Sequence, residues 1–113
     1  MEISIVALVV IAFLVWRFKT TSGVNTISTS QLKNRLNDKD IVFIDVRTPA
    51  EYKNRHISQF KNLPLGSDLS TLPNNKEIIV ICQSGMRSNQ ACKQLKKLGY
   101  KNITNVSGGM NAY

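Results

Sequence analysis

The residues best suited to carry chemistry lie in one short segment, CQSGMRS, at positions 82–88. Cys82 ends an apolar run and precedes a segment with helical spacing, and ligand sites of open α/β sheets gather at the carboxyl ends of strands. A tight loop at this point can aim several backbone N–H groups into one concavity, and Gly85 permits the backbone angles that such a loop needs. The segment is therefore a candidate active-site loop with Cys82 as its nucleophile.

The electrostatic surroundings of Cys82 favour a thiolate over a thiol. The helix after the loop presents its positive end, and Arg87 adds a full positive charge. Cysteines in such surroundings have pKa values between about 3.5 and 7.5, compared with about 8.5 for a free thiol. The same cradle can bind an oxyanion, so nucleophile and anion site coincide. The alternative is that Cys82 is a small apolar residue at the end of a core strand.

The loop resembles the active-site loop of the rhodanese family, in which Cys, two residues, Gly, one residue and Arg form a persulfide cradle. Three other segments resemble signatures of that family, and all occur in the family's order across positions 45–113. They are DVRTPAEY at 45–52, HISQFKNLP at 56–64 and VSGGMNAY at 106–113.

The resemblance implies a three-layer α/β domain with a central parallel sheet and a persulfide of Cys82 as the reaction intermediate. A sulfane sulfur would move from thiosulfate or a persulfide donor to a thiol or cyanide, without a metal or an organic cofactor. Arg87 would stabilise the loop and contact the anion. The other residues expected to contact substrate are Gln83, Ser84, Gly85, Met86 at the mouth of the pocket, and Ser88.

Two other functions remain open. Cysteine phosphatases place five residues between Cys and Arg, whereas four separate Cys82 from Arg87. A smaller ring suits a single sulfur atom, so the resemblance favours sulfur transfer over phosphatase or arsenate reductase chemistry. A membrane-tethered scaffold or redox sensor could use the same reactive thiol without turnover.

Two almost wholly apolar runs predict the strands that position the loop. IVFIDV at 41–46 and EIIVIC at 77–82 suit strands buried on both faces of a parallel sheet, and KNITNV at 101–106 is a weaker candidate. Alternation of such strands with helical segments predicts an α/β domain.

Two capping boxes predict where helices begin. Ser28 is followed three residues later by Gln31, and Thr48 is followed by Pro49 and then by Glu51. In each case a hydroxyl and an N3 side chain can satisfy the free N–H groups of the first turn, and Pro49 has the backbone angle of a first helical residue.

A third helix is expected after the loop. Ala91, Leu95 and Leu98 share one helical face, and Gly99 is placed to end the helix. Cys92 lies next to this face, so burial against the sheet is favoured over a role as a resolving thiol.

Three polar residues precede the loop in the chain. Asp45 and Arg47 end a strand at the same edge of the sheet as Cys82. A buried or half-buried ion pair that fixes the neighbouring loops is favoured over direct contact with substrate. His56 is the single histidine. It lacks partners at metal-ligand spacing and is expected to be structural, hydrogen-bonded to backbone.

The N-terminal segment is expected to be a membrane anchor. Positions 3–16 carry no charge, and positions 1–18 would form about 27 Å of helix at ~1.5 Å per residue, just enough to span a bilayer. A cleaved signal peptide would have its positive charge before the apolar run, and here the order is reversed. A buried helix of the domain is the remaining alternative.

The charges that flank this segment predict its orientation. Glu2 precedes the apolar run, whereas Arg17 and Lys19 follow it. The positive-inside rule then places the following domain in the cytoplasm, as part of a single-pass protein of the cell membrane. The expected organisation is an anchor at 1–19, a linker at 20–25 and a rhodanese-like domain at 26–113.

The composition is that of a globular protein with a basic surface. Apolar residues make up 42% of the chain, and the formal net charge is +8. The basic residues are scattered and accompany no nucleic-acid-binding motif, so anionic lipid headgroups and small anionic substrates are favoured over nucleic acid. The expected partners are a small anionic sulfur donor, a thiol or cyanide acceptor, a membrane and a protein of a sulfur relay.

Overall fold

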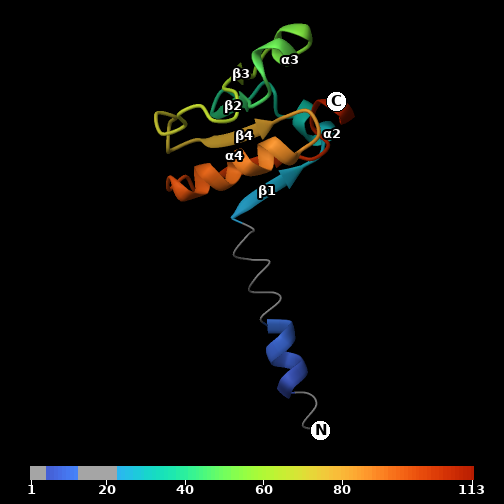
Figure 1. The fold of residues 1–113 in the computed structure, drawn as a ribbon, viewed down its shortest axis with the longest axis vertical. Helices are drawn as coiled ribbons and strands as arrows, with labels where there is room; N and C mark the ends of the chain where they lie inside the picture. Colours follow the sequence, from blue (N-terminus) through green and yellow to red (C-terminus); the bar gives the residue numbers. More distant parts are fainter. Residues whose placement is uncertain (1–4, 13–22) are drawn as a thin grey trace.

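The computed structural model describes residues 5–12 and 23–113 (Figure 1). Residues 23–113 form an α/β domain around a five-stranded parallel sheet with the strand order β1-β5-β4-β2-β3. The predicted α/β class with a central parallel sheet is therefore confirmed for these residues. The strands are β1 (Val24–Ile27), β2 (Ile41–Asp45), β3 (Lys61–Asn62), β4 (Glu77–Ile81) and β5 (Ile103–Val106).

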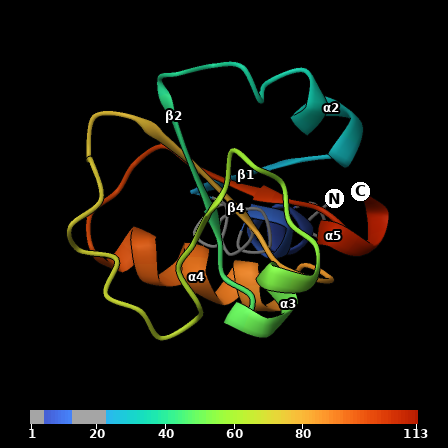
Figure 2. The same ribbon diagram turned by 90° about the horizontal axis from the view of Figure 1, so that it is seen from above.

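Helices cover both faces of the sheet and make the domain three-layered (Figure 2). One face packs against α4 (Met86–Lys97), and the other packs against α2 (Thr29–Lys33) and α5 (Gly109–Ala112). Within residues 23–113, the remaining helix is α3 (Pro49–Asn54), which follows β2.

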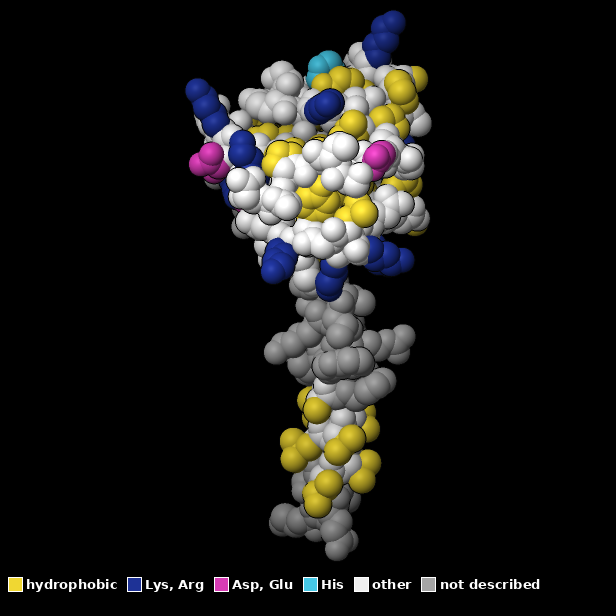
Figure 3. Space-filling view, turned by 90° about the vertical axis from the view of Figure 1, so that its left-hand side faces the viewer, with side chains coloured by type: hydrophobic (Ala, Val, Ile, Leu, Met, Phe, Trp, Pro, Cys, Tyr) yellow, Lys and Arg dark blue, Asp and Glu magenta, His cyan; other side chains and the backbone are white. Residues whose placement is uncertain are grey.

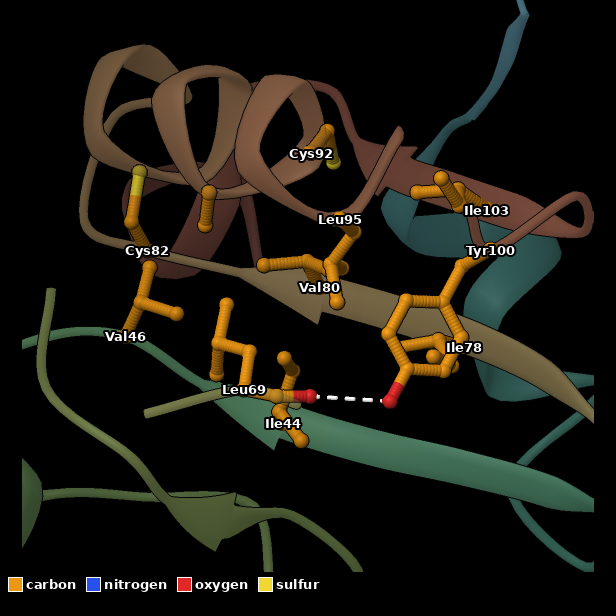
Figure 4. Close-up of a cluster of buried hydrophobic side chains, with 11 residues drawn as sticks. Ile44, Val46, Leu69, Ile78, Val80, Cys82, Cys92, Leu95, Tyr100 and Ile103 are labelled. Carbon is orange, nitrogen blue, oxygen red and sulfur yellow. Dashed lines mark hydrogen bonds between the residues drawn. The ribbon is translucent and has the colours of Figure 1, made fainter. Parts of the chain in front are cut away.

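The central strand β4 is buried on both faces from Ile78 to Ile81, where its residues are apolar without interruption. Ile78 and Val80 belong to the core cluster under α4, whereas Ile79 and Ile81 belong to the cluster under α2 and α5. This split follows from the alternation of side chains along a strand. Figure 4 shows the cluster under α4, which also includes Cys82.

The register between β2 and β4 brings two polar segments to one edge of the sheet. Asp45 lies beside Ile81, and the N–H of Val46 donates to the carbonyl of Ile81 at 3.0 Å. Both strands run in the same direction. The residues after Asp45 and the residues after Ile81 therefore leave the sheet side by side.

Both predicted capping boxes are present. In the first, the N–H of Gln31 donates to the hydroxyl of Ser28 at 3.1 Å and the side chain of Gln31 accepts from the N–H of Ser28 at 2.8 Å. In the second, Thr48 and Glu51 make the same pair of bonds at the start of α3, where Pro49 is the first helical residue.

The structure corrects the expected helix after the loop and the expected linker. Ala91 and Leu95 are buried, but Leu98 is 51% exposed because it is the C-cap, where the chain leaves α4 before Gly99. Val24 and Asn25, assigned to the linker, belong to β1. Sequence reasoning also missed β3 and α5, which are too short to carry a pattern of their own.

The predicted membrane anchor at 1–19 lies in part outside the described residues. Residues 5–12 are helical, and six of their side chains are apolar and 50–67% exposed (Figure 3). Within residues 5–12 and 23–113, no helix combines the length and apolar character needed to cross a bilayer. The predicted transmembrane helix is thus not supported by the structure.

Candidate active site

The loop after β4 closes around the sulfur of Cys82. Gly85 adopts a left-handed conformation with φ 109° as the N-cap of α4, and its N–H donates to Cys82 Sγ at 2.9 Å. The Cys82 thiol lies 3.2 Å from the hydroxyl of Ser88, which donates to the carbonyl of Gly85 at 3.1 Å. The loop therefore surrounds the sulfur with polar groups.

These contacts favour ionisation of Cys82. The residue has no exposed surface, and burial alone raises the pKa of a thiol. The hydroxyl of Ser88 and the backbone N–H groups of Ser88, Gly85 and Ser84 act in the opposite direction. Their sum outweighs burial and holds the pKa of Cys82 below its ordinary value. The site thus presents a nucleophile that is shielded from water and activated by hydrogen bonds.

Arg87 binds Glu51 of α3. Nη1 and Nη2 of the guanidinium donate to the two carboxylate oxygens at 2.6 and 2.9 Å, and both side chains are 33% exposed. The hydrogen bond from Arg87 is the main reason why the pKa of Glu51 falls to about 2. Sequence reasoning expected Arg87 to stabilise the loop and to contact the anion. The structure directs its guanidinium toward a carboxylate of the neighbouring helix.

Asp45 and Arg47 form a buried ion pair at the base of the site. Nη2 and Nε of Arg47 donate to the carboxylate at 2.9 and 3.1 Å, and the exposed fractions of the two residues are 0% and 2%. The guanidinium also donates to the carbonyl of Arg55 at 2.6 Å and to Oε1 of Gln83 at 3.1 Å. The pair thereby joins β2, the end of α3 and the loop, as sequence reasoning favoured.

The C-terminal segment supports the loop from the other side. The N–H of Met110 donates to the carbonyl of Cys82 at 2.8 Å, and the N–H of Asn111 donates to the carbonyl of Gln83 at 3.0 Å. The side-chain amide of Gln83 also donates to Oδ1 of Asn111 at 2.6 Å. Gln83 is therefore held between Arg47 and α5.

The remaining loop side chains point outward. Ser84 is exposed, and Met86 is 76% exposed as the first residue of α4. Neither side chain reaches the sulfur, so in this structure the backbone N–H of Ser84 is the part of that residue that acts on Cys82.

Cys92 and His56 take structural positions. Cys92 is fully buried in α4, and burial raises its pKa to about 12. Nδ1 of His56 lies 2.8 Å from the carbonyl of Tyr52, and the two rings stack at 4.0 Å. Among residues 5–12 and 23–113, no group of three or more His, Cys, Asp or Glu side chains could hold a metal ion.

Sequence reasoning missed the roles of Glu51 and Asn111 at this site. Glu51 was identified only as a capping residue, and its second partner lies 36 residues further along the chain. Asn111 was noted only within a C-terminal signature. Both residues lie at the sheet edge that holds Cys82. That shared position would have indicated their roles, but it can be inferred only once the strand order is known.

Comparisons with known proteins agree with this architecture. The family described as "Rhodanese-like domain" matches residues 28–113. A sulfurtransferase from Allochromatium vinosum is 36% identical, with 80% of this chain and 88% of the relative covered. The putative sulfurtransferase YtwF from Bacillus subtilis is 38% identical, with 80% of this chain and 90% of the relative covered.

A solved structure gives the same result. The crystal structure of a rhodanese-like domain protein from Staphylococcus aureus superimposes with a TM-score of 0.71 at 32% identity, over 78% of this chain and 89% of that one. Fold, loop geometry and sequence similarity lead to one assignment. The chain belongs to the rhodanese-like domain family.

Proposed function

We propose that this protein is a sulfurtransferase that moves a sulfane sulfur from thiosulfate or a persulfide donor to a thiol or cyanide through a persulfide of Cys82. The observation that carries the proposal is the cradle around Sγ, in which the N–H of Gly85 and the hydroxyl of Ser88 face a sulfur of lowered pKa. Relatives named sulfurtransferases support it.

The reaction has two halves. The Cys82 thiolate attacks the outer sulfur of the donor, a new S–S bond forms, and the donor's own S–S bond breaks to release sulfite or a thiolate. The acceptor then attacks the outer sulfur of the Cys82 persulfide. Thiocyanate or an acceptor persulfide leaves, and the thiolate of Cys82 is restored. No electrons enter or leave the overall exchange.

The chain's own groups have distinct roles in these steps. The loop N–H groups stabilise negative charge on Cys82 Sγ and on the outer sulfur of the persulfide. Because Cys82 has no exposed surface, a donor must displace part of the loop to reach it. The side chain of Gln83 bonds the start of the loop to Arg47 and Asn111. These hydrogen bonds must break if the start of the loop moves, so we expect the loop to open at Gln83.

Intact mass spectrometry of the full chain after incubation with thiosulfate tests the proposal. We expect a gain of the mass of one sulfur atom that a thiol reductant reverses. The gain should be retained in Cys92→Ser and lost in Cys82→Ser. If Cys82 alkylates readily but never gains sulfur, the reactive thiol serves another purpose, such as redox sensing, and sulfur transfer is ruled out.

We also propose that the N-terminal segment holds the domain at the cell membrane, with the domain on the cytoplasmic side. Support comes from the uncharged run at 3–16 and from the exposed apolar side chains of residues 5–12. Leu8→Lys should shift the protein from the membrane fraction to the supernatant, because a lysine near the centre of a bilayer span costs about 3 kcal/mol. Digestion by protease added outside intact cells would contradict the orientation.

A further inference from the structure

Glu51 neutralises Arg87, a cation in the loop that forms the sulfur cradle. Arg87 lies one residue before Ser88, whose hydroxyl is 3.2 Å from Cys82 Sγ. The bidentate contact with Glu51 occupies one N–H of each terminal nitrogen of the guanidinium. A guanidinium and a carboxylate in hydrogen-bond contact present a much weaker electric field to an incoming anion than a free arginine does.

Glu51 is itself held in place by α3. Its Oε1 accepts from the N–H of Thr48 at 3.1 Å and from the hydroxyl of Thr48 at 3.0 Å, in the capping box of the helix. The carboxylate therefore cannot turn away from Arg87 without breaking the cap. The ion pair is a built feature of the domain, and it fixes the direction in which Arg87 points.

We propose that Glu51 is a specificity-determining residue that, by neutralising Arg87, disfavours a doubly charged sulfur donor relative to a singly charged one. The inference rests on the proposed function. The Coulomb energy between a donor and this site scales with the charge of the donor. Thiosulfate, with two negative charges, therefore loses about twice as much as a persulfide with one.

Both donors convert Cys82 to the same persulfide, so their rates of sulfur transfer to Cys82 can be compared directly. With thiosulfate, Cys82 Sγ bonds to the outer sulfur, the S–S bond of the donor breaks, and sulfite leaves with the electron pair. With cysteine persulfide, the same bond forms and cysteine thiolate leaves. Since the Cys82 persulfide is common to both, any change in the ratio of the two loading rates reports on the donor and not on the nucleophile.

Glu51→Gln is the informative variant. Glutamine is a capping-box residue, and Gln31 already has that role in the Ser28 box of this chain. The substitution thus keeps the cap of α3 and removes one negative charge. Glu77→Gln is the matched control, because Glu77 accepts from both terminal nitrogens of Arg35, as Glu51 does from those of Arg87. Glu77 is the first residue of β4, and Cys82 directly follows the last one. Glu77→Gln therefore changes the net charge by the same amount as Glu51→Gln, but at the end of the strand remote from Cys82.

The experiment measures the second-order rate of Cys82 persulfidation by quenched intact mass spectrometry, for thiosulfate and for cysteine persulfide. We expect Glu51→Gln to raise the thiosulfate-to-persulfide ratio of rates by about three- to tenfold at low salt, and less at high salt. Glu77→Gln should leave the ratio at the wild-type value. A merely structural role for Glu51 would alter both rates alike, and an unchanged ratio would overturn the inference.

A double variant separates an effect through Arg87 from direct repulsion by Glu51. In an Arg87→Ala background, Glu51→Gln should change the ratio much less than it does alone, because no guanidinium is freed from Glu51 to turn toward the donor. An equal change in both backgrounds would mean that the carboxylate acts directly on the donor, and the inference would fail. If the wild-type chain accepts sulfur from neither donor, the proposed function fails first and this inference with it.

Discussion

Gly109 lies so close to the backbone of Cys82 that a β-carbon at position 109 would stand 2.2 Å from the carbonyl oxygen of Cys82. The same oxygen accepts the N–H of Met110 at 2.8 Å. Gly109 also has φ +56°, in the left-handed region. The backbone of the nucleophile is thus positioned by direct contact with α5, and the contact leaves no room for a side chain.

Gly109→Ala should destabilise the fold by about 3 kcal/mol, from overpacking of ~1–3 kcal/mol and a left-handed backbone penalty of ~1–2 kcal/mol. The measurement is urea denaturation. Gly66→Ala is the control, because Gly66 has φ +98° with nothing within 4 Å of its added β-carbon. That variant should lose only the backbone penalty. Equal losses in the two variants would contradict the contact with Cys82.

Cys82→Ser should abolish transfer of sulfur from thiosulfate to cyanide, measured as thiocyanate, because the hydroxyl cannot form the persulfide. Cys92→Ser should retain most of the activity, since Cys92 is buried and its pKa is raised to about 12. Strong loss in the Cys92 variant, with an unchanged melting temperature, would assign a chemical role to the second thiol.

Ser88→Ala should raise the pKa of Cys82, because the hydroxyl is the largest of the groups that lower it. The pH midpoint of the iodoacetamide alkylation rate measures this pKa. Ser84→Ala removes an exposed hydroxyl but keeps the backbone N–H, so its midpoint should stay at the wild-type value. A midpoint in Ser88→Ala at or below that of wild type would refute the role of the hydroxyl.

The lowered pKa of Cys82 also links folding stability to pH. Because the folded thiol has a lower pKa than the unfolded one, ionisation stabilises the fold. The contribution is fully present above the unfolded pKa and disappears as pH falls through the folded pKa. Wild type should therefore gain more stability than Cys82→Ser as pH rises through this window in urea titrations, and parallel curves would contradict the shift.

Arg87→Ala should raise the pKa of Cys82 and slow the use of thiosulfate. The variant removes a cation that attracts the thiolate, and it leaves the carboxylate of Glu51 without its partner. Arg87→Lys should restore the pKa better than the rate, because an ammonium supplies charge without the planar fork. Alkylation midpoints and steady-state kinetics measure the two effects. No change in either, in a folded variant, would remove Arg87 from the mechanism.

Gln83→Ala should make Cys82 more accessible without a large change of its pKa. The variant deletes the hydrogen bond that Gln83 accepts from Arg47 and the one that it donates to Asn111, which restrain the loop over a residue with no exposed surface. At a pH where the thiol is ionised, alkylation should accelerate about two- to tenfold, as expected if about 0.5–1.5 kcal/mol of hydrogen bonding opposes opening. Gln94→Ala, an exposed glutamine of α4, is the control. An unchanged rate would show that other contacts close the loop.

The parts of the fold that could be predicted are those set by local sequence. The apolar runs that became β2 and β4, and the capping boxes of Ser28 and Thr48, depend on neighbours within a few residues. In contrast, β3 is two residues long, and it is a strand only because Lys61 and Asn62 pair with Ile44 and Asp45 of β2. Likewise, β1 carries exposed polar residues and depends on its pairing with β5.

The site shows the same division between local and distant determinants. The loop of Cys82 is identifiable because its residues are contiguous, so their spacing marks a candidate active-site loop and carries the resemblance to a persulfide cradle. The partner of Arg87 could not be inferred in this way. Glu51 has a complete local explanation as a capping residue, and nothing within α3 indicates that its carboxylate also meets an arginine from α4.

The support that α5 gives to the loop has a consequence for the newly made chain. Cys82 leaves the ribosome before Met110 and Asn111, whose N–H groups fix the carbonyls of Cys82 and Gln83. Until those residues emerge, the nucleophile lacks the backing that holds its loop, although β2 and β4 have already been synthesised. The loop can therefore take its final position only after Met110 and Asn111 have been synthesised, so the order of synthesis places the loop before the segment that fixes it.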